Sequence, residues 1–211
     1  GSEMKIEKVP SGSSMFQVHL QLHHTCFKIQ EEDEVYEYAF DILNQEQALL
    51  YASTDHYLDE VIEEFLFYSG FIHVIKDQQG TLLYEAPPKK RFKVLLSEIQ
   101  PSQFYINEKK LTELATWVKS DKDILIPVTK FQGQWVALDG HTRLKLAQLL
   151  NIKEVYAYEE ETDAYIEDFV LFCKEQQKDS IYDLPIISET EYEVLWNQFC
   201  ENYFKFLNQE N

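Results

Sequence analysis

Alternation of apolar and polar positions divides the first ninety residues into short strands and one helix. Residues 15–23 alternate with a period of two, which predicts a strand. Residues 31–34 are all acidic and indicate a turn or the start of a helix. Residues 59–68 carry apolar side chains at helical spacing, and two apolar runs at 71–75 and 81–84 flank a hairpin turn. This part of the chain therefore predicts a small α+β unit.

The middle of the chain alternates strand and helix patterns. Leu111, Leu114, Ala115 and Val118 have the spacing of one helix face, and Asn107 precedes them as a candidate cap. Gln132-Gly133 separates two apolar runs and predicts a hairpin turn. In chain order we expect a strand at 92–96, a helix at 108–120, strands at 124–129 and 134–138, a helix at 142–150 and a strand at 153–158.

The last fifty residues favour helices. The pattern predicts helices at 163–177 and 189–208, joined by a loop that contains Pro185. An aromatic stripe at helical spacing runs along the second helix, and its members are Tyr192, Leu195, Trp196, Phe199, Tyr203 and Phe206. Such a stripe usually packs into a core, and a partner-binding face is the alternative.

A proline- and lysine-rich stretch, residues 87–91, separates the first unit from the rest as a stiff connector. We therefore expect three regions: an N-terminal α+β unit at 4–88, a mixed core at 91–160, and a helical C-terminal extension at 161–211 packed on that core. The fold class is α+β.

Charge is distributed unevenly along the 211 residues, whose formal net charge is −18. Residues 1–90 hold 6 basic and 16 acidic side chains, and residues 155–211 hold 3 and 14. Residues 91–154 hold 10 and 7, so only this stretch is net positive. Nucleic-acid binding needs surplus cations to neutralise phosphates, so we do not expect a general nucleic-acid partner.

Composition also bears on location. The 45% of hydrophobic residues can build a core, but no run approaches the length of a membrane span. Gly1 to Glu3 resemble residues added ahead of a native Met4, and the absence of an apolar run there predicts no signal peptide. Three scattered cysteines, Cys26, Cys173 and Cys200, fit reduced thiols better than a disulfide framework or zinc site. We expect a cytoplasmic protein.

Candidate chemistry lies at the joint between the strand at 134–138 and the helix that follows. The sequence there is Asp139-Gly140-His141-Thr142-Arg143, hereafter the 139–143 box. A helix N-terminus presents unpaired N–H groups and a partial positive charge, so it attracts anions. Gly140 admits a ligand close to the backbone, and Arg143 can bind phosphate oxygens with two donors. His141, Thr142 and Lys145 add donors, and Asp139 could hold a magnesium ion or a ribose hydroxyl.

A capped turn is the alternative explanation of the box. In that case Asp139 caps the helix, Gly140 fills the turn, and His141 and Arg143 face solvent. The five residues alone do not separate a turn from a site, and their context therefore matters.

The stretch from about residue 94 to residue 158 resembles the ParB N-terminal/sulfiredoxin-like superfamily. The motifs that carry the resemblance are EIQPSQ at 98–103, KLTELA at 110–115, IPV at 126–128, and DGHTRLKLA followed by LLNIKEV at 139–155. The resemblance covers about a third of the chain. It implies a mixed α/β core that binds a nucleotide through the 139–143 box.

Members of this superfamily differ in what they do with the nucleotide. The box is most similar to the DGHHR pattern of the free serine kinases, with Thr142 in place of the second histidine. Sulfiredoxins carry a cysteine in the position of His141, so sulfinic-acid reduction is not expected. Those kinases use a glutamate base near the start of the domain, but the corresponding loop here reads Pro101-Ser102-Gln103. Glu98 or Glu108 could replace it, although an acid at Glu108 also simply complements a helix dipole.

Two hypotheses follow. In the first, the protein is a phosphotransferase or nucleotidase that uses ATP or another nucleotide, with Mg²⁺ as a candidate ion and a small hydroxyl compound as substrate. Glu108 and Asp139 would be its catalytic carboxylates. In the second, the core binds a nucleotide without chemistry, and the acidic, aromatic flanks contact a protein partner. A DNA-partitioning or nuclease role is a third, weaker alternative, and no membrane partner is expected.

Overall fold

The computed structural model describes residues 4–9, 24–116 and 118–209, and the strand predicted at 15–23 lies outside them. The chain divides into two compact units, the first ending at Lys89 and the second beginning at Lys90. The division falls within the proline- and lysine-rich connector. The regions expected at 91–160 and 161–211 belong to one unit. In the described parts of the chain, no helix is long and apolar enough to cross a membrane.

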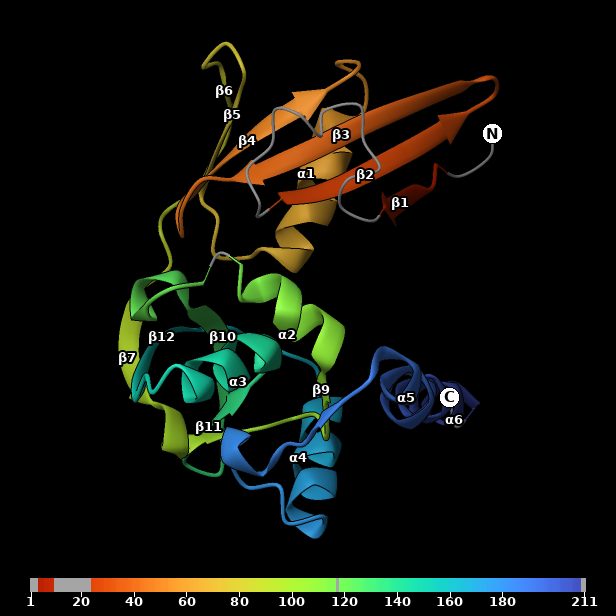
Figure 1. Ribbon diagram of the computed structural model, residues 1–211. Helices are drawn as coiled ribbons and strands as arrows, with labels where there is room; N and C mark the ends of the chain where they lie inside the picture. The colour runs from red at the N-terminus through yellow and green to blue at the C-terminus, as the bar shows by residue number, and fades with distance from the viewer. Residues whose placement is uncertain (1–3, 10–23, 117, 210–211) are drawn as a thin grey trace. The chain divides into compact units, whose positions relative to one another are not determined.

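The first unit is a six-stranded sheet with one helix (Figure 1). The strand order is β1-β2-β3-β4-β5-β6, and all neighbours are antiparallel except β4 and β5. Helix α1 connects these two parallel strands, as a crossover must. The elements are β1 Ile6–Val9, β2 His24–Glu31, β3 Glu34–Ile42, β4 Gln47–Ala52, α1 Leu58–Tyr68, β5 Val74–Asp77 and β6 Leu82–Glu85.

Helix α1 packs against the sheet through the apolar face that its sequence predicts. Val61, Ile62 and Phe65 are its buried residues, and the ring of Phe65 stacks on Phe40 of β3 at 4.0 Å. The hairpin expected after it forms as β5 and β6. The acidic residues 31–34 form the turn between β2 and β3, with Glu32 at φ 52°. The unit is therefore α+β, as expected.

The second unit contains a five-stranded mixed sheet in the order β7-β12-β10-β11-β8 and a two-stranded sheet of β9 and β13. Strands β10 and β12 are parallel, and so are β11 and β8, whereas β10–β11 and β12–β7 are antiparallel. The elements are β7 Arg91–Leu95, η2 Leu96–Glu98, β8 Ile99–Gln100, β9 Ile106–Asn107, α2 Glu108–Leu114, η3 Asp121–Asp123, β10 Leu125–Phe131, β11 Gln134–Ala137, α3 His141–Leu149, β12 Glu154–Glu159, α4 Tyr165–Glu175, η4 Ile181–Asp183, β13 Ile186–Ile187, α5 Glu189–Tyr192, the π-helical turn η5 Glu193–Asn197, and α6 Gln198–Gln209.

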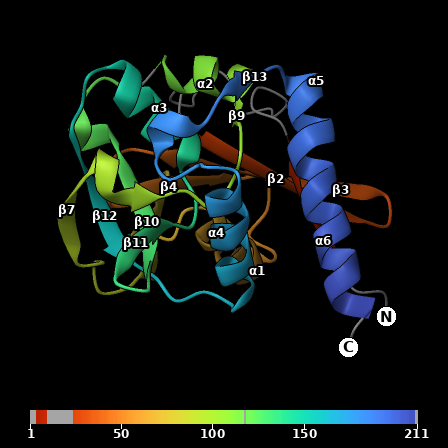
Figure 2. The same ribbon diagram turned by 90° about the horizontal axis from the view of Figure 1, so that it is seen from below.

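Helices α3 and α4 cover opposite faces of this sheet. Adjacent strand residues point to opposite faces. In β11, Ala137 packs in the main core with Leu144 and Ala147 of α3, whereas Val136 packs with Ile166 and Val170 of α4. In Figure 2, α4 lies between the strands and α6. The start of α3 is therefore built on a strand that is held from both sides.

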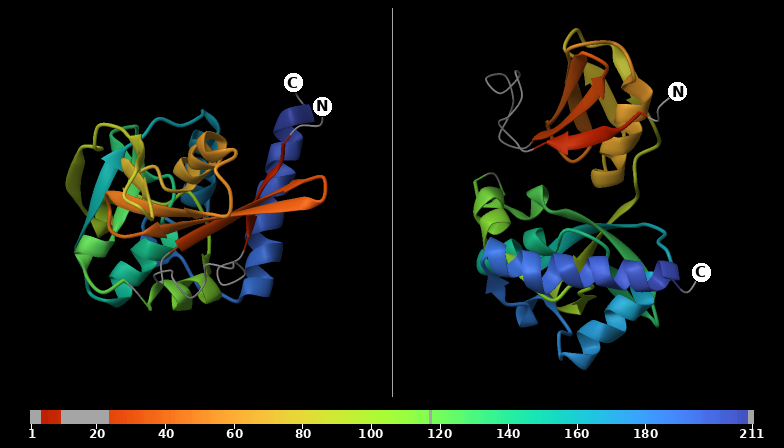
Figure 3. Two further views of the ribbon diagram at one scale, coloured as in Figure 1. Left: turned by 90° about the horizontal axis from the view of Figure 1, so that it is seen from above. Right: turned by 90° about the vertical axis from the view of Figure 1, so that its right-hand side faces the viewer.

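The C-terminal helix, α5 to α6, joins α4 through an aromatic cluster (Figure 3, right panel). Phe169 of α4 lies 5.8 Å from Trp196 and 4.9 Å from Tyr203, measured between ring centroids. The stripe predicted on this helix is thus partly core: Tyr192 and Trp196 are buried, but Leu195 is 43% and Phe206 58% exposed.

Helix α2 is shorter than its sequence predicts. It ends at Leu114, whereas the apolar spacing predicts helix to residue 120. The Asp123 carboxylate accepts hydrogen bonds from the amides of Lys119 and Ser120, and this turns the chain into η3. Val118 is still buried, at 1% exposure, but it reaches the core from outside the helix. The predicted cap is confirmed, because the Asn107 side chain accepts from the amide of Lys109 at 3.0 Å.

Candidate functional site

The 139–143 box lies where β11 passes into α3, above the first half of β10. The amide of Leu138 donates to the carbonyl of Pro127 at 3.0 Å, which ties this joint to β10. Gly140 then adopts φ 82° and is the residue before the first turn of α3. A Cβ built on Gly140 would lie 2.6 Å from Cγ2 of Ile126, so the backbone approaches β10 more closely than any side chain allows. Glycine is therefore required here for both conformation and space.

Asp139 does not cap the helix, which contradicts the capped-turn alternative. Gly140 occupies the cap position, and no side chain accepts a hydrogen bond from the first turn of α3. The Asp139 side chain is exposed, and its Oδ1 accepts from the amide of Gly140 at 2.7 Å. The helix N-terminus is thus left without a side-chain cap beside an exposed carboxylate.

Arg143 folds back over the beginning of its own helix. Its Cζ lies 3.5 Å from the position of a Cβ on Gly140, and Nη1 donates to the carbonyl of Leu125 at 2.7 Å. The side chain is half-buried, which again differs from the solvated arginine of the capped-turn alternative. One bond therefore holds the guanidinium at the helix N-terminus, and its four remaining N–H donors are not part of that bond.

His141 is buried and neutral, so it adds no positive charge to the box. It is 3% exposed, and its Nε2 accepts from the amide of Ser102 at 3.0 Å. Desolvation lowers the pKa of His141 to about 4, against a smaller opposing effect of the Asp139 carboxylate. Because Nε2 accepts, the proton of the neutral ring is on Nδ1, which has no hydrogen-bond partner in the described structure. His141 joins the 101–103 loop to α3.

Lys145 also points into the protein. It is 6% exposed, and its Nζ donates to the carbonyl of Ile181 in η4 at 3.1 Å. Desolvation lowers the pKa of this ammonium, while the carboxylate of Asp183 acts in the opposite direction. The sequence suggested Lys145 as a second cation at the N-terminus of α3, but its ammonium group is directed to η4 instead.

Charges of the box affect the pKa of two buried tyrosines that were not among the residues predicted for the site. Burial raises the pKa of Tyr158 at the end of β12, where Arg143 and Asp139 also act on its hydroxyl. Burial likewise raises the pKa of Tyr192 in α5 to about 12, with a smaller contribution from Asp139.

Glu108 is the first residue of α2, and its side chain is exposed. Helix α2 packs beside α3, and β9 before it also contacts α3. In the described residues, however, no hydrogen bond or ion pair joins the Glu108 carboxylate to the box. Its position in the first turn agrees with the simpler role of complementing the α2 dipole.

The box offers one carboxylate as a possible ligand of a metal ion. Mg²⁺ is commonly held by one or two carboxylates together with substrate phosphates, and Asp139 supplies one exposed carboxylate. Within residues 4–9, 24–116 and 118–209, no group of three or more His, Cys, Asp or Glu side chains is arranged to hold a metal by itself.

Comparison with known proteins yields little beyond this geometry. No family model and no curated protein matches the chain. One solved structure with some likeness is that of protein Atu1540 from Agrobacterium tumefaciens, at 11% identity and a TM-score of 0.34. The matched region covers 46% of this chain and 62% of that protein, which is less than two thirds of its length.

Proposed function

We propose that the second unit binds the phosphate group of a nucleotide at the N-terminal end of α3. The observation that carries the proposal is the placement of the Arg143 guanidinium over a helix N-terminus that no side chain caps. Proteins bind phosphate with free backbone amides at a helix N-terminus, with the helix dipole, and with a guanidinium that donates two hydrogen bonds.

The donor set for phosphate is smaller than the sequence suggested. Gly140, Thr142 and Arg143 remain as the binding residues, since Gly140 begins the first turn of α3, Arg143 lies over it, and Thr142 is half-buried at the same turn. His141 and Lys145 are positioning residues, because both side chains are buried and form hydrogen bonds to other segments of the unit. The proposal includes the ParB/sulfiredoxin-like fold for residues 91–160, with the β10–β11–α3–β12 segment as its nucleotide-binding part.

Phosphoryl transfer to a small hydroxyl compound is the enzymatic form of this proposal. Asp139 would hold Mg²⁺ against the phosphate, where the ion would neutralise developing charge. Arg143 would orient the phosphate, and the acceptor hydroxyl would attack its phosphorus as the bond to the leaving nucleotide breaks. Glu108, on the helix that packs beside α3, would accept the hydroxyl proton.

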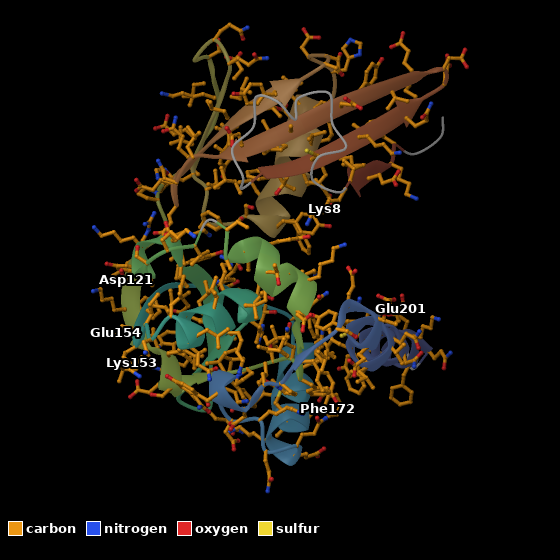
Figure 4. All side chains as sticks on the ribbon, in the orientation of Figure 1. Lys8, Asp121, Lys153, Glu154, Phe172 and Glu201 are labelled. Carbon is orange, nitrogen blue, oxygen red and sulfur yellow. The ribbon has the colours of Figure 1, made fainter. Side chains whose placement is uncertain are left out.

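Binding is tested by calorimetric titration of the full chain with ATP, ADP and CTP, each with Mg²⁺. Arg143→Ala should weaken binding roughly tenfold to a hundredfold, because a hydrogen bond from a charged group contributes about 1.5–3 kcal/mol. Lys153→Ala is the matched control: it removes one exposed positive charge just beyond the opposite end of α3 (Figure 4). Equal effects of the two substitutions, or no binding of any nucleotide at near-millimolar concentration, would exclude the site.

Turnover separates the enzyme from the binding module. Formation of the dephosphorylated nucleotide and of the phosphorylated acceptor is measured with Mg²⁺ and a nucleotide, with and without small hydroxyl compounds such as serine; release of free phosphate reports hydrolysis. Glu108→Gln should abolish transfer while binding persists, whereas Glu113→Gln on the same exposed helix should leave both unchanged. Binding without turnover in the wild-type chain would support the module instead.

A non-catalytic interaction module is the second candidate, and one surface favours it. Val194 is 53% and Phe206 58% exposed on the C-terminal helix, next to acidic residues such as Glu201 (Figure 4). A protein partner that covered these side chains would remove their apolar surface from water. A nucleotide would then regulate or stabilise the module rather than react.

A further inference from the structure

A cleft of about 280 Å³ lies within the first unit, apart from the nucleotide site just proposed. Its walls come from the end of β4, the loop into α1, and the turn between β5 and β6. Leu50, Leu58 and Leu83 supply its apolar lining, and Leu50 is only 2% exposed. The volume is close to the lower end of small-molecule sites, roughly 300–1,000 Å³.

Two aspartates line this cleft, the first exposed and the second half-buried. Asp55 comes from the loop before α1, and Asp77 from the end of β5. Oδ1 of Asp77 accepts from the amides of Gln79 and Thr81, both at 2.9 Å, so the orientation of the carboxyl group is fixed. In the described part of the chain, no cation pairs with either carboxylate, and no Lys, Arg or His lines the cleft.

Hydrogen bonds fix the loop that forms one wall of the cleft. The Ser53 hydroxyl accepts from the amide of Glu37 at 2.9 Å, and the Thr54 hydroxyl accepts from the amide of His56 at 3.2 Å. These bonds fix the loop that carries Asp55. A ligand therefore does not have to order this wall when it binds, which favours affinity.

The charge of the cleft decides the class of ligand. Helix α1 begins here without a side-chain cap, which by itself would favour an anion. However, Asp59 and Glu60 already occupy its first turn, and residues 1–90 hold 16 acidic against 6 basic side chains. A cation is favoured instead. The leucine side chains have no oxygen atoms to coordinate a bare metal ion, so they would not contribute to its binding. An alkyl chain would bury against them.

We propose that this cleft binds an aliphatic ammonium or guanidinium group, with the charge between Asp55 and Asp77 and the carbon chain against the leucines. The same chemistry is offered by a free polyamine and by a lysine or arginine side chain of a partner protein. Gln78 and Gln79 at the rim add neutral acceptors for the remaining N–H donors.

The test is a titration of the full ¹⁵N-labelled chain, monitored by amide chemical shifts. Pentylamine should shift the amides of Ser53, Thr54, Gln78 and Gln79 in a saturable way, and the shifts should weaken as salt is raised. Pentanol, which has the same chain without the charge, should produce no saturable shift. Spermidine and a blocked lysine peptide are titrated in parallel: the tighter of the two identifies the source of the cation, and either one supports the site.

Two substitutions test the carboxylates. Asp77→Asn keeps the oxygen that holds the turn and should weaken pentylamine binding about threefold to fivefold, as expected for partly exposed ion pairs. Asp55→Asn should act similarly and does not touch the hairpin. Asp33→Asn, in the β2–β3 turn, makes the same charge change outside the cleft and should leave binding unchanged. The proposal is overturned if none of the three cations binds at about ten-millimolar concentration, or if Asp33→Asn weakens binding as much as the cleft variants.

Discussion

Replacing Gly140 by alanine should destabilise the second unit far more than the same change at Gly133. Both glycines have positive φ, 82° and 78°, so each variant incurs about 1–2 kcal/mol of backbone strain. Around Gly133 a Cβ meets nothing within 4 Å, whereas at Gly140 it would lie 2.6 Å from Ile126 Cγ2. Ile126 is fully buried in the core and cannot move aside. Overpacking of this kind costs a further 1–3 kcal/mol, roughly.

The expected loss in free energy of unfolding is therefore about 2–5 kcal/mol for Gly140→Ala and about 1–2 kcal/mol for Gly133→Ala. Urea denaturation monitored by tryptophan fluorescence measures both, since Trp135 and Trp196 report on the unit that contains both glycines. The lower entropy of the unfolded chain affects both variants alike, so it cancels in the difference. Equal losses in the two variants would refute the close approach of α3 to β10.

Three further outcomes follow from the second unit. The pKa of His141 is about 4 in the folded state and 6.5 in the unfolded state, so the unfolded state binds more protons between these pH values. The free energy of unfolding should therefore fall by about 3 kcal/mol as the pH is lowered from 6.5 to 4. His141→Gln should flatten this part of the plot of stability against pH, and an unchanged slope would mean that the ring is not buried in its neutral form. Asn107→Ala should cost about 0.5–2 kcal/mol in urea denaturation by removing the α2 cap, with Asn107→Asp as the variant that retains it. Phe169→Ala should lower the free energy of unfolding by about 3–5 kcal/mol and make the C-terminal helix sensitive to limited proteolysis. The Phe206 side chain is 58% exposed, so Phe206→Ala should change stability by less than about 0.5 kcal/mol. Similar losses in the two variants would contradict the packing of α4 on α6.

The spacing of apolar residues was sufficient to predict those helices and strands that bury a single face. Helices α1, α3 and α4, and the hairpins β5–β6 and β10–β11, lie within a few residues of where their patterns predict them. Each has an apolar face or a turn signal that acts locally, so the sequence spacing carries the information. The boundary near residue 89 was visible for the same reason, because two prolines and a run of cations resist burial.

Long-range contacts account for what the patterns missed. Helix α2 stops early because a carboxylate nine residues beyond Leu114 binds the turn amides, and spacing alone does not reveal which backbone groups an aspartate will reach. Strands β2, β3 and β4 form the centre of the first sheet, although their sequences lack clean alternation over their full length. In β3 the residues from Tyr38 to Ile42 are buried in succession, so this half of the strand is covered on both faces and shows no alternation.

The composition of the candidate site shows the same division. The order Asp139-Gly140-His141-Thr142-Arg143, the need for glycine at the joint and the presence of a helix N-terminus there could all be inferred from residues next to one another in the chain. Which side chains face solvent could not. His141 turns inward because the Ser102 amide, 39 residues earlier, donates to its ring, and Lys145 turns inward to a carbonyl 36 residues later. A charge in the sequence becomes a charge at the site only if the fold leaves it solvated, and burial is decided by the elements that pack around α3.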